Sequence, residues 1–208
     1  MKFFFTLILA FGLCAGLPSR AHADEVQTIV FFGDSLTAGY GLDDHVTTAY
    51  PGLIQKKIYE EGLPYRVVNA GLSGDTSAGG VRRINWILRQ KIDIFVLELG
   101  ANDGLRGLPV ASTRTNLQAI IDAVRAKNPA VKLVVAGMEM PLSMGEYTKE
   151  FAAMYPALAK ANAATLIPFL LKDVGGRPEL NLPDGIHPTP EGHRIVAETV
   201  WEILRPLL

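Results

Sequence analysis

A serine near the start of the chain and an Asp-x-x-His motif near its end offer the side chains of a nucleophilic hydrolase. Ser35 follows an apolar run in Gly33-Asp34-Ser35-Leu36, and His187 closes the motif Asp184-Gly185-Ile186-His187. A serine hydroxyl is a weak nucleophile and needs an adjacent base to remove its proton. A fold that brought these residues together would make His187 that base, with Asp184 orienting its imidazole.

Two further motifs follow apolar runs and carry hydrogen-bond donors. In Asn69-Ala70-Gly71-Leu72-Ser73-Gly74-Asp75, the glycine at position 71 would let its backbone N–H approach a reacting oxygen. In Gly100-Ala101-Asn102-Asp103, the side chain of Asn102 can donate to a developing oxyanion. Ser73 is a rival nucleophile, but Asp75 stands where the last glycine of Gly-x-Ser-x-Gly would be, which argues against that elbow.

Each of these motifs also has a purely structural interpretation. Asp34 or Ser35 can cap a helix, and we expect Asp34 to fix a turn rather than to take part in chemistry. Glycine, asparagine and aspartate dominate tight turns, so the other two motifs can be turns alone. Of the remaining histidines, His45 is expected in a polar loop, and His193 is expected within the last helix as a surface or packing residue.

Apolar runs alternate with amphipathic runs along the chain. Strands are expected at 27–32, 66–69, 92–99, 131–136 and 165–168, and helices at 50–61, 77–90, 112–127, 149–162 and 190–204. This alternation predicts a parallel sheet covered by helices on both faces. The segment 178–183 is expected to be a loop. Ligands of such folds bind outside the carboxyl ends of the strands, where the candidate residues converge.

Composition favours one globular enzyme domain. The 208 residues are 49% hydrophobic and 20% charged, with a net charge of -1 and no basic block, so nucleic acid is not expected as a partner. Residues 1–23 are typical of a secretory signal, with Lys2, an apolar stretch and Ala21-His22-Ala23 as the cleavage pattern. Cleavage would leave a single domain at 24–208, exported across the inner membrane to the periplasm without stable membrane insertion. An uncleaved anchor is the alternative. Removal of Cys14 would exclude disulfides and thiol chemistry.

The four motifs, in their order and spacing, resemble those of the SGNH (GDSL) hydrolases. The resemblance covers the whole mature chain and is closest to the arylesterase, acyl-CoA thioesterase and lysophospholipase branch, through 100–107 and 184–188. It implies a flavodoxin-like three-layer α/β/α sandwich with a mainly parallel five-stranded sheet. It also implies Ser35 as nucleophile, His187 as base and Asp184 as its partner. The backbone N–H groups of Ser35 and Gly71 and the Asn102 side chain would form the oxyanion hole, with no metal or other cofactor.

The resemblance leaves the substrate open among aryl esters, acyl thioesters and lysophospholipids, and it does not define an oligomeric state. The side chains of 138–142 are expected to line the acyl groove. Two other classes of function remain as alternatives. A two-metal phosphoesterase would use the acidic loops, but the chain lacks the accompanying histidines. A non-catalytic periplasmic binding module of the same fold would lack a triad member, and none is missing.

Overall fold

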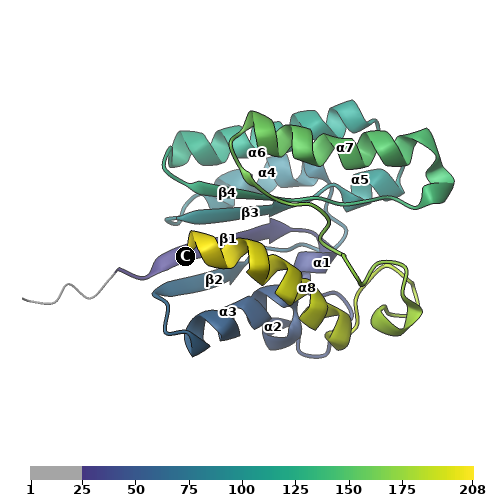
Figure 1. The fold of residues 1–208 in the computed structure, drawn as a ribbon. Coiled ribbons are helices and arrows are strands. Elements are labelled where there is room, and N and C mark those ends of the chain that lie inside the picture. The colour runs from purple at the N-terminus through teal and green to yellow at the C-terminus, as the bar shows by residue number, and fades with distance from the viewer. Residues whose placement is uncertain (1–24) are drawn as a thin grey trace, which may run out of the picture.

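The computed structural model describes residues 25–208, which form a five-stranded sheet between two layers of helices (Figure 1). All strand pairs are parallel, and the strand order is β2-β1-β3-β4-β5. The strands are β1 (Gln27–Gly33), β2 (Tyr65–Asn69), β3 (Ile94–Glu98), β4 (Lys132–Ala136) and β5 (Thr165–Ile167). The three-layer α/β fold predicted from the sequence is therefore confirmed.

The two central strands are buried on both faces, which explains their continuous apolar sequences. Every residue of β3 is buried, and so is every residue of β1 after Gln27. Their register pairs Gly33 with Glu98, so the two strands end side by side. From β1 the chain goes first to β2 on one side and then crosses back to β3 on the other side of β1. In such folds, ligands bind at the carboxyl ends of the two strands where the order reverses, here β1 and β3.

The longer helices cover both faces of the sheet. They are α3 (Tyr50–Glu60), α4 (Ser77–Ile87), α6 (Val110–Lys127), α7 (Glu146–Ala161) and α8 (Pro190–Leu204). Helices α3 and α8 pack together on one face, and α4, α6 and α7 form the other layer (Figure 1). This division follows from right-handed crossovers, because the step from β1 to β2 runs opposite to all later steps.

Local capping explains where the observed helices depart from the predicted ranges. Helix α6 starts two residues early because Pro109 precedes it, and α7 starts at Glu146 directly after Gly145, which has a φ of 63°. Helix α8 begins as predicted, with the Thr189 side chain accepting a hydrogen bond from the Gly192 N–H and with Pro190 as its first residue.

Short helices are the elements that the sequence pattern did not predict, because a single turn shows no periodicity. Two of them, α1 (Ser35–Ala38) and α5 (Ala101–Leu105), directly follow β1 and β3. A third, α2 (His45–Thr48), begins at His45, which was expected in a loop. The segment 178–183 is also not simply a loop, because Pro178–Leu180 forms a 3-10 turn.

The proposed signal sequence, 1–23, lies outside the described residues. Within residues 25–208, none of the helices combines the length and the apolar character needed to cross a bilayer.

Candidate active site

Ser35 is the first residue of α1 and stands at the carboxyl end of β1. The preceding Asp34 caps this helix, accepting a hydrogen bond from the Leu36 N–H at 3.0 Å. Ser35 is largely buried, yet it lines the largest pocket described. The strand and the capped turn therefore hold Ser35 in the lining of a cavity.

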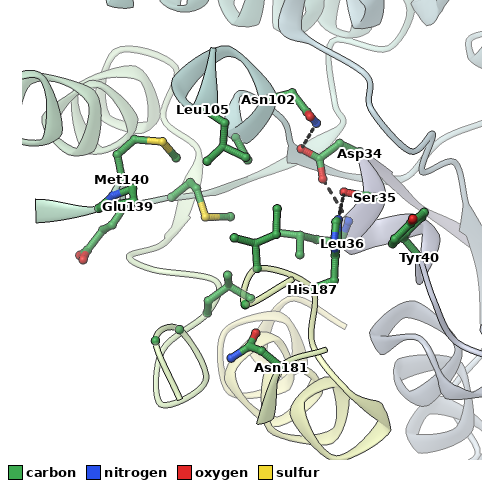
Figure 2. A pocket seen from close by; sticks show the side chains of 18 of the residues that line it. Asp34, Ser35, Leu36, Tyr40, Asn102, Leu105, Glu139, Met140, Asn181 and His187 are labelled. Carbon is green, nitrogen blue, oxygen red and sulfur yellow. Dashed lines mark hydrogen bonds between the residues drawn. The ribbon is translucent and has the colours of Figure 1, made fainter. Parts of the chain in front are cut away.

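His187 and Asp184 come from the loop before α8 and reach Ser35 in the order expected for a triad. The His187 Nε2 atom lies 2.9 Å from Ser35 Oγ, and its Nδ1 atom lies 2.8 Å from Asp184 Oδ2 (Figure 2). Asp184 Oδ1 also accepts hydrogen bonds from the backbone N–H groups of Ile186 and His187. One carboxylate thus folds its own loop and orients the imidazole.

These contacts keep Asp184 ionised. The Ile186 N–H and the hydrogen bonds from His187 lower the pKa of Asp184 from 3.8 to about 2. An anion beside Nδ1 favours the tautomer with the proton on Nδ1, and this leaves Nε2 free to accept the proton of Ser35.

Asn102 lies in the first turn of α5, across from Ser35. Its side-chain Nδ2 donates to Asp34 Oδ2 at 3.2 Å (Figure 2). Because a side-chain amide has two N–H groups, this bond leaves one donor for another acceptor. The amide lines the same pocket as Ser35 and His187.

A buried polar network lies beneath Asp34. Glu98 accepts hydrogen bonds from the Asp34 backbone N–H at 3.2 Å and from Thr37 Oγ1 at 2.7 Å, and Thr37 Oγ1 also contacts the Tyr50 hydroxyl at 2.7 Å. Burial raises the pKa of Asp34 to about 6, and burial together with the charge of Asp34 raises the pKa of Glu98 well above 4.5. The two carboxyl groups therefore resist ionising together.

Gly71 does not line the pocket, and unlike Asp184 it has no hydrogen bond to the Ser35–His187 pair. Its N–H donates to Asn69 Oδ1 at 3.0 Å within its own loop, and it packs against the backbone of Thr37 and Ala38. Gly74, three residues later, lines the pocket with a φ of 77° and open space beside it. Within residues 25–208, the Gly74 N–H has no protein acceptor.

The pocket itself is mostly apolar, with a volume of about 760 Å³. Ser35 and His187 lie at one end, and Met140 and Glu139 lie at the other (Figure 2). The expectation that 138–142 line the groove is confirmed. Apolar side chains line the rest of the cavity: Leu36, Leu105, Met138, Leu142, Phe169, Leu171 and Ile186.

The other histidines and the rival serine lie outside this hydrogen-bonded set. His193 is buried in α8, where its Nδ1 accepts a hydrogen bond from the Tyr50 N–H, and burial lowers its pKa to about 4. Ser73 lines the pocket, but within the described residues the hydroxyl bonded to His187 is that of Ser35. Asp34 has the structural contacts that were expected of it.

Among the residues that line the pocket, Gly74 and Tyr40 lie near the Ser35–His187 pair in sequence or space and were given no role by sequence reasoning. The Tyr40 ring lies against the His187 ring, with 4.6 Å between centroids. No periodicity marks an aromatic residue in a turn. In the chain from 25 to 208, no group of three or more histidine, cysteine, aspartate or glutamate side chains is arranged to hold a metal ion.

A parallel α/β sheet with a Ser-His-Asp array at its carboxyl edge defines a class of serine hydrolases. Residues 31–195 match the GDSL-like Lipase/Acylhydrolase family. The chain is 39% identical over 197 residues to Esterase TesA of Pseudomonas aeruginosa, covering 94% of this chain and 96% of that protein. It is 34% identical to Thioesterase 1/protease 1/lysophospholipase L1 of Escherichia coli, covering 100% of this chain and 93% of that protein.

The similarity extends to three dimensions. A crystal structure of TesA superposes with a TM-score of 0.83 at 40% identity, covering 88% of this chain and all of that chain. The chain therefore belongs to the GDSL-like lipase/acylhydrolase family, also called SGNH hydrolases. It is an ester-hydrolysing serine hydrolase that acts on small molecules.

Proposed function

We propose that the chain hydrolyses carboxylic esters and acyl thioesters through an acyl-enzyme on Ser35. One observation carries this proposal: the hydrogen-bonded series from Asp184 through His187 to Ser35 opens onto an apolar pocket. The series supplies an activated nucleophile, and the pocket is suited to an acyl chain.

The cycle has two halves. Ser35 Oγ attacks the substrate carbonyl while His187 Nε2 takes the hydroxyl proton, and the carbonyl oxygen becomes an oxyanion. Collapse of the tetrahedral intermediate expels the alcohol or thiol, which receives that proton from His187. Water then attacks the acyl-enzyme with His187 again as base, releasing the carboxylic acid and restoring Ser35.

We assign the oxyanion hole to the Ser35 N–H, the Gly74 N–H and the free N–H of the Asn102 amide. The Ser35 N–H is at the start of α1, where helix N–H groups lack intrahelical acceptors. Gly74 replaces Gly71 in this assignment, because the Gly71 N–H is already bonded to Asn69, whereas Gly74 lines the pocket. Preorganised donors of this kind stabilise the tetrahedral oxyanion.

The substrate class follows from the pocket lining. A cavity of about 760 Å³ with methionine and leucine walls suits a medium acyl chain, and the methionines can adapt to several chain lengths. Aryl esters, acyl thioesters and lysophospholipids all present such a chain. Measuring turnover of p-nitrophenyl esters and acyl thioesters of graded chain length would rank the ester and thioester substrates. A narrow preference for acetyl esters would contradict the assignment of the pocket as an acyl groove.

Replacement of Ser35 tests the mechanism directly. Ser35→Ala is expected to abolish ester hydrolysis and labelling by a fluorophosphonate while the melting curve stays unchanged, since only one hydroxyl is lost. Ser73→Ala is the matched control, and it should retain both ester hydrolysis and fluorophosphonate labelling. Substantial turnover by Ser35→Ala would remove Ser35 from its role.

Chelation tests the alternative of a two-metal phosphoesterase. We expect EDTA to leave esterase activity unchanged, because the proposed cycle uses only protein groups and water. Loss of activity on chelation, restored by a divalent ion, would favour the phosphoesterase.

We further propose that the chain is exported to the periplasm and cleaved after Ala23, leaving one domain at 24–208. The positive start, the short apolar stretch and the Ala-x-Ala pattern support this. Intact-mass analysis of periplasmic protein should give a chain that begins at Asp24. A mature chain retaining residues 1–23 would favour the anchor.

A further inference from the structure

We infer that Tyr40 is a positioning residue for the reaction, holding the His187 imidazole in line with Ser35. The inference rests on the proposed roles of Ser35 and His187. It assigns to Tyr40 an effect on the base rather than on the substrate.

The two hydrogen bonds of His187 leave one rotation of its ring weakly restrained. Its bonds to Asp184 and Ser35 meet the ring at opposite nitrogens, 2.8 and 2.9 Å from their partners. Two hydrogen bonds at opposite nitrogens of a ring restrain rotation about the line that joins them only weakly, because such a rotation changes neither distance. A contact on the ring face can stop that rotation.

The Tyr40 ring supplies this contact. The centroids of the two rings are 4.6 Å apart, which is within the distance range of favourable aromatic pairs, and their planes are inclined by 43°. Figure 2 shows Tyr40 on the opposite side of Ser35 from Met140 and Glu139. Tyr40 therefore packs beside the base, away from the far end of the acyl pocket.

The backbone of Tyr40 is tied to the nucleophile itself. The N–H groups of Gly39 and Tyr40 both donate to the Ser35 carbonyl at 3.0 Å, which closes the single turn of α1. Gly39 has a φ of 78°, the left-handed geometry typical of a helix C-cap. The segment 35–40 thus carries both the hydroxyl and the aromatic surface against which its base rests.

A second contact anchors the loop that carries His187. A Cβ at Gly41 would lie 2.4 Å from Leu182 Cδ1, so the backbone there is packed tightly under that leucine. Leu182 in turn donates its N–H to the His187 carbonyl at 2.7 Å. Tyr40 and Gly41 together contact the base and the start of its loop.

The aromatic face also suits the charge that His187 acquires. His187 becomes an imidazolium whenever it holds the Ser35 proton, and an aromatic face attracts a cation. The stabilisation is larger in the tetrahedral intermediates than in the ground state, so its loss should lower kcat more than it changes KM.

Replacement of the ring by an aliphatic side chain tests this role. Tyr40→Leu is expected to lower kcat for a short p-nitrophenyl ester about tenfold, with KM changed less than about twofold. The rate of fluorophosphonate labelling of Ser35 should fall in parallel, since that reaction also needs the base. Tyr40→Phe, which keeps the ring, should recover most of the lost kcat.

The control is Tyr59→Leu, because Tyr59 is an exposed tyrosine on α3, 83% accessible and outside the pocket. It should leave kcat and KM unchanged. Kinetics are normalised to sites titrated with the fluorophosphonate, and melting curves report the fold. Three results would overturn the inference: normal kcat in Tyr40→Leu, an equal loss in Tyr40→Phe, or a loss confined to KM. Activity remaining in Ser35→Ala would instead refute the proposed function.

Discussion

Two carboxylates flank the same serine, and they are held in opposite ways. Asp34 is fully buried, and it caps α1 and binds the Asn102 amide above a network that includes Glu98. Asp184 lies on a loop with 38% of its side chain exposed and takes its hydrogen bonds from residues two and three positions later. Burial raises the pKa of Asp34 to about 6, whereas backbone hydrogen bonds lower that of Asp184 to about 2.

The difference shows how one site combines a rigid side and an adaptable side. Ser35, the proposed nucleophile, and Asn102, the proposed oxyanion donor, are held by strands and a buried polar network, so their positions depend on the core. The base depends on a short loop that organises itself through Asp184. Changes on the Asp34 side should therefore alter stability and chemistry together, and changes on the Asp184 side should alter chemistry with little effect on stability.

The largest effect is expected for Asn102, the donor on the buried side. Asn102→Ala should lower kcat by about 10²–10³-fold and leave KM nearly unchanged, because its bond strengthens as the carbonyl becomes tetrahedral. Asn102→Asp should be at least as harmful, since it places a negative charge beside the oxyanion. Steady-state kinetics with a short aryl ester measure both.

Asn162→Ala is the matched control for Asn102, because Asn162 bonds to Gln118 and the Leu158 carbonyl, outside the pocket. It should alter stability alone. A near-normal kcat for Asn102→Ala, or a loss accounted for by unfolding, would eliminate Asn102 from the oxyanion hole.

The two glycines of the 69–75 loop come next in size. Gly71→Ala should lower the free energy of unfolding by about 3 kcal/mol, because its Cβ would lie 2.3 Å from the Ala38 backbone nitrogen. The Cβ of Gly74→Ala would meet no neighbour. This substitution should therefore lower the free energy of unfolding by about 1–2 kcal/mol, which is the strain of an alanine at positive φ. Denaturant melts give both values.

Kinetics on the same variants locate the donor. The folded fraction of Gly71→Ala, counted by fluorophosphonate titration, should keep its kcat because the amide of residue 71 does not face the pocket. A hundredfold loss in kcat per titrated site would return Gly71 to the oxyanion hole.

The effects of pH on stability have opposite signs on the two sides of the site. The folded-state pKa of Asp34 is raised from 3.8 to about 6, so the folded protein holds this proton more tightly than the unfolded chain. Its contribution is fully present below pH 3.8 and is lost as pH rises towards 6, by an amount on the order of 3 kcal/mol. As pH rises from 3.8 to 6, the free energy of unfolding of the wild type should therefore fall relative to that of Asp34→Asn, which has no such proton to lose.

Asp184 should behave in the reverse way. Its pKa is lowered from 3.8 to about 2, so its contribution is present above pH 3.8 and is lost as pH falls through 2. Because the group is exposed, solvent screening keeps the contribution below about 1 kcal/mol. The free energy of unfolding of Asp184→Asn should thus differ little from that of the wild type at pH 7, and the difference should be smaller still at pH 2. Equal pH slopes for the Asp34 and Asp184 variants would refute the contrast between the two sides.

The sequence predicted the alternation of strands and helices because buried parallel strands have a continuous apolar pattern. It also predicted the meeting of Ser35, His187 and Asn102, because the carboxyl ends of neighbouring strands share one edge of the sheet. The proposal of Gly74 in place of Gly71 was not accessible from the sequence, because it rests on the hydrogen bond from the Gly71 N–H to Asn69 and on the positive φ of Gly74. The contact of Tyr40 with His187 was equally hidden, because it joins two irregular segments.

The hydrogen bond between His187 and Ser35 spans 152 positions of the chain, and this separation has a consequence for folding kinetics. Ser35 follows the first strand, whereas His187 directly precedes the helix that packs against α3 and β5. Contacts between residues so distant form only after most loop-closure entropy has been lost. In a refolding experiment, regain of esterase activity should therefore follow the formation of helical secondary structure, and truncation of α8 should yield a chain that cannot close this contact.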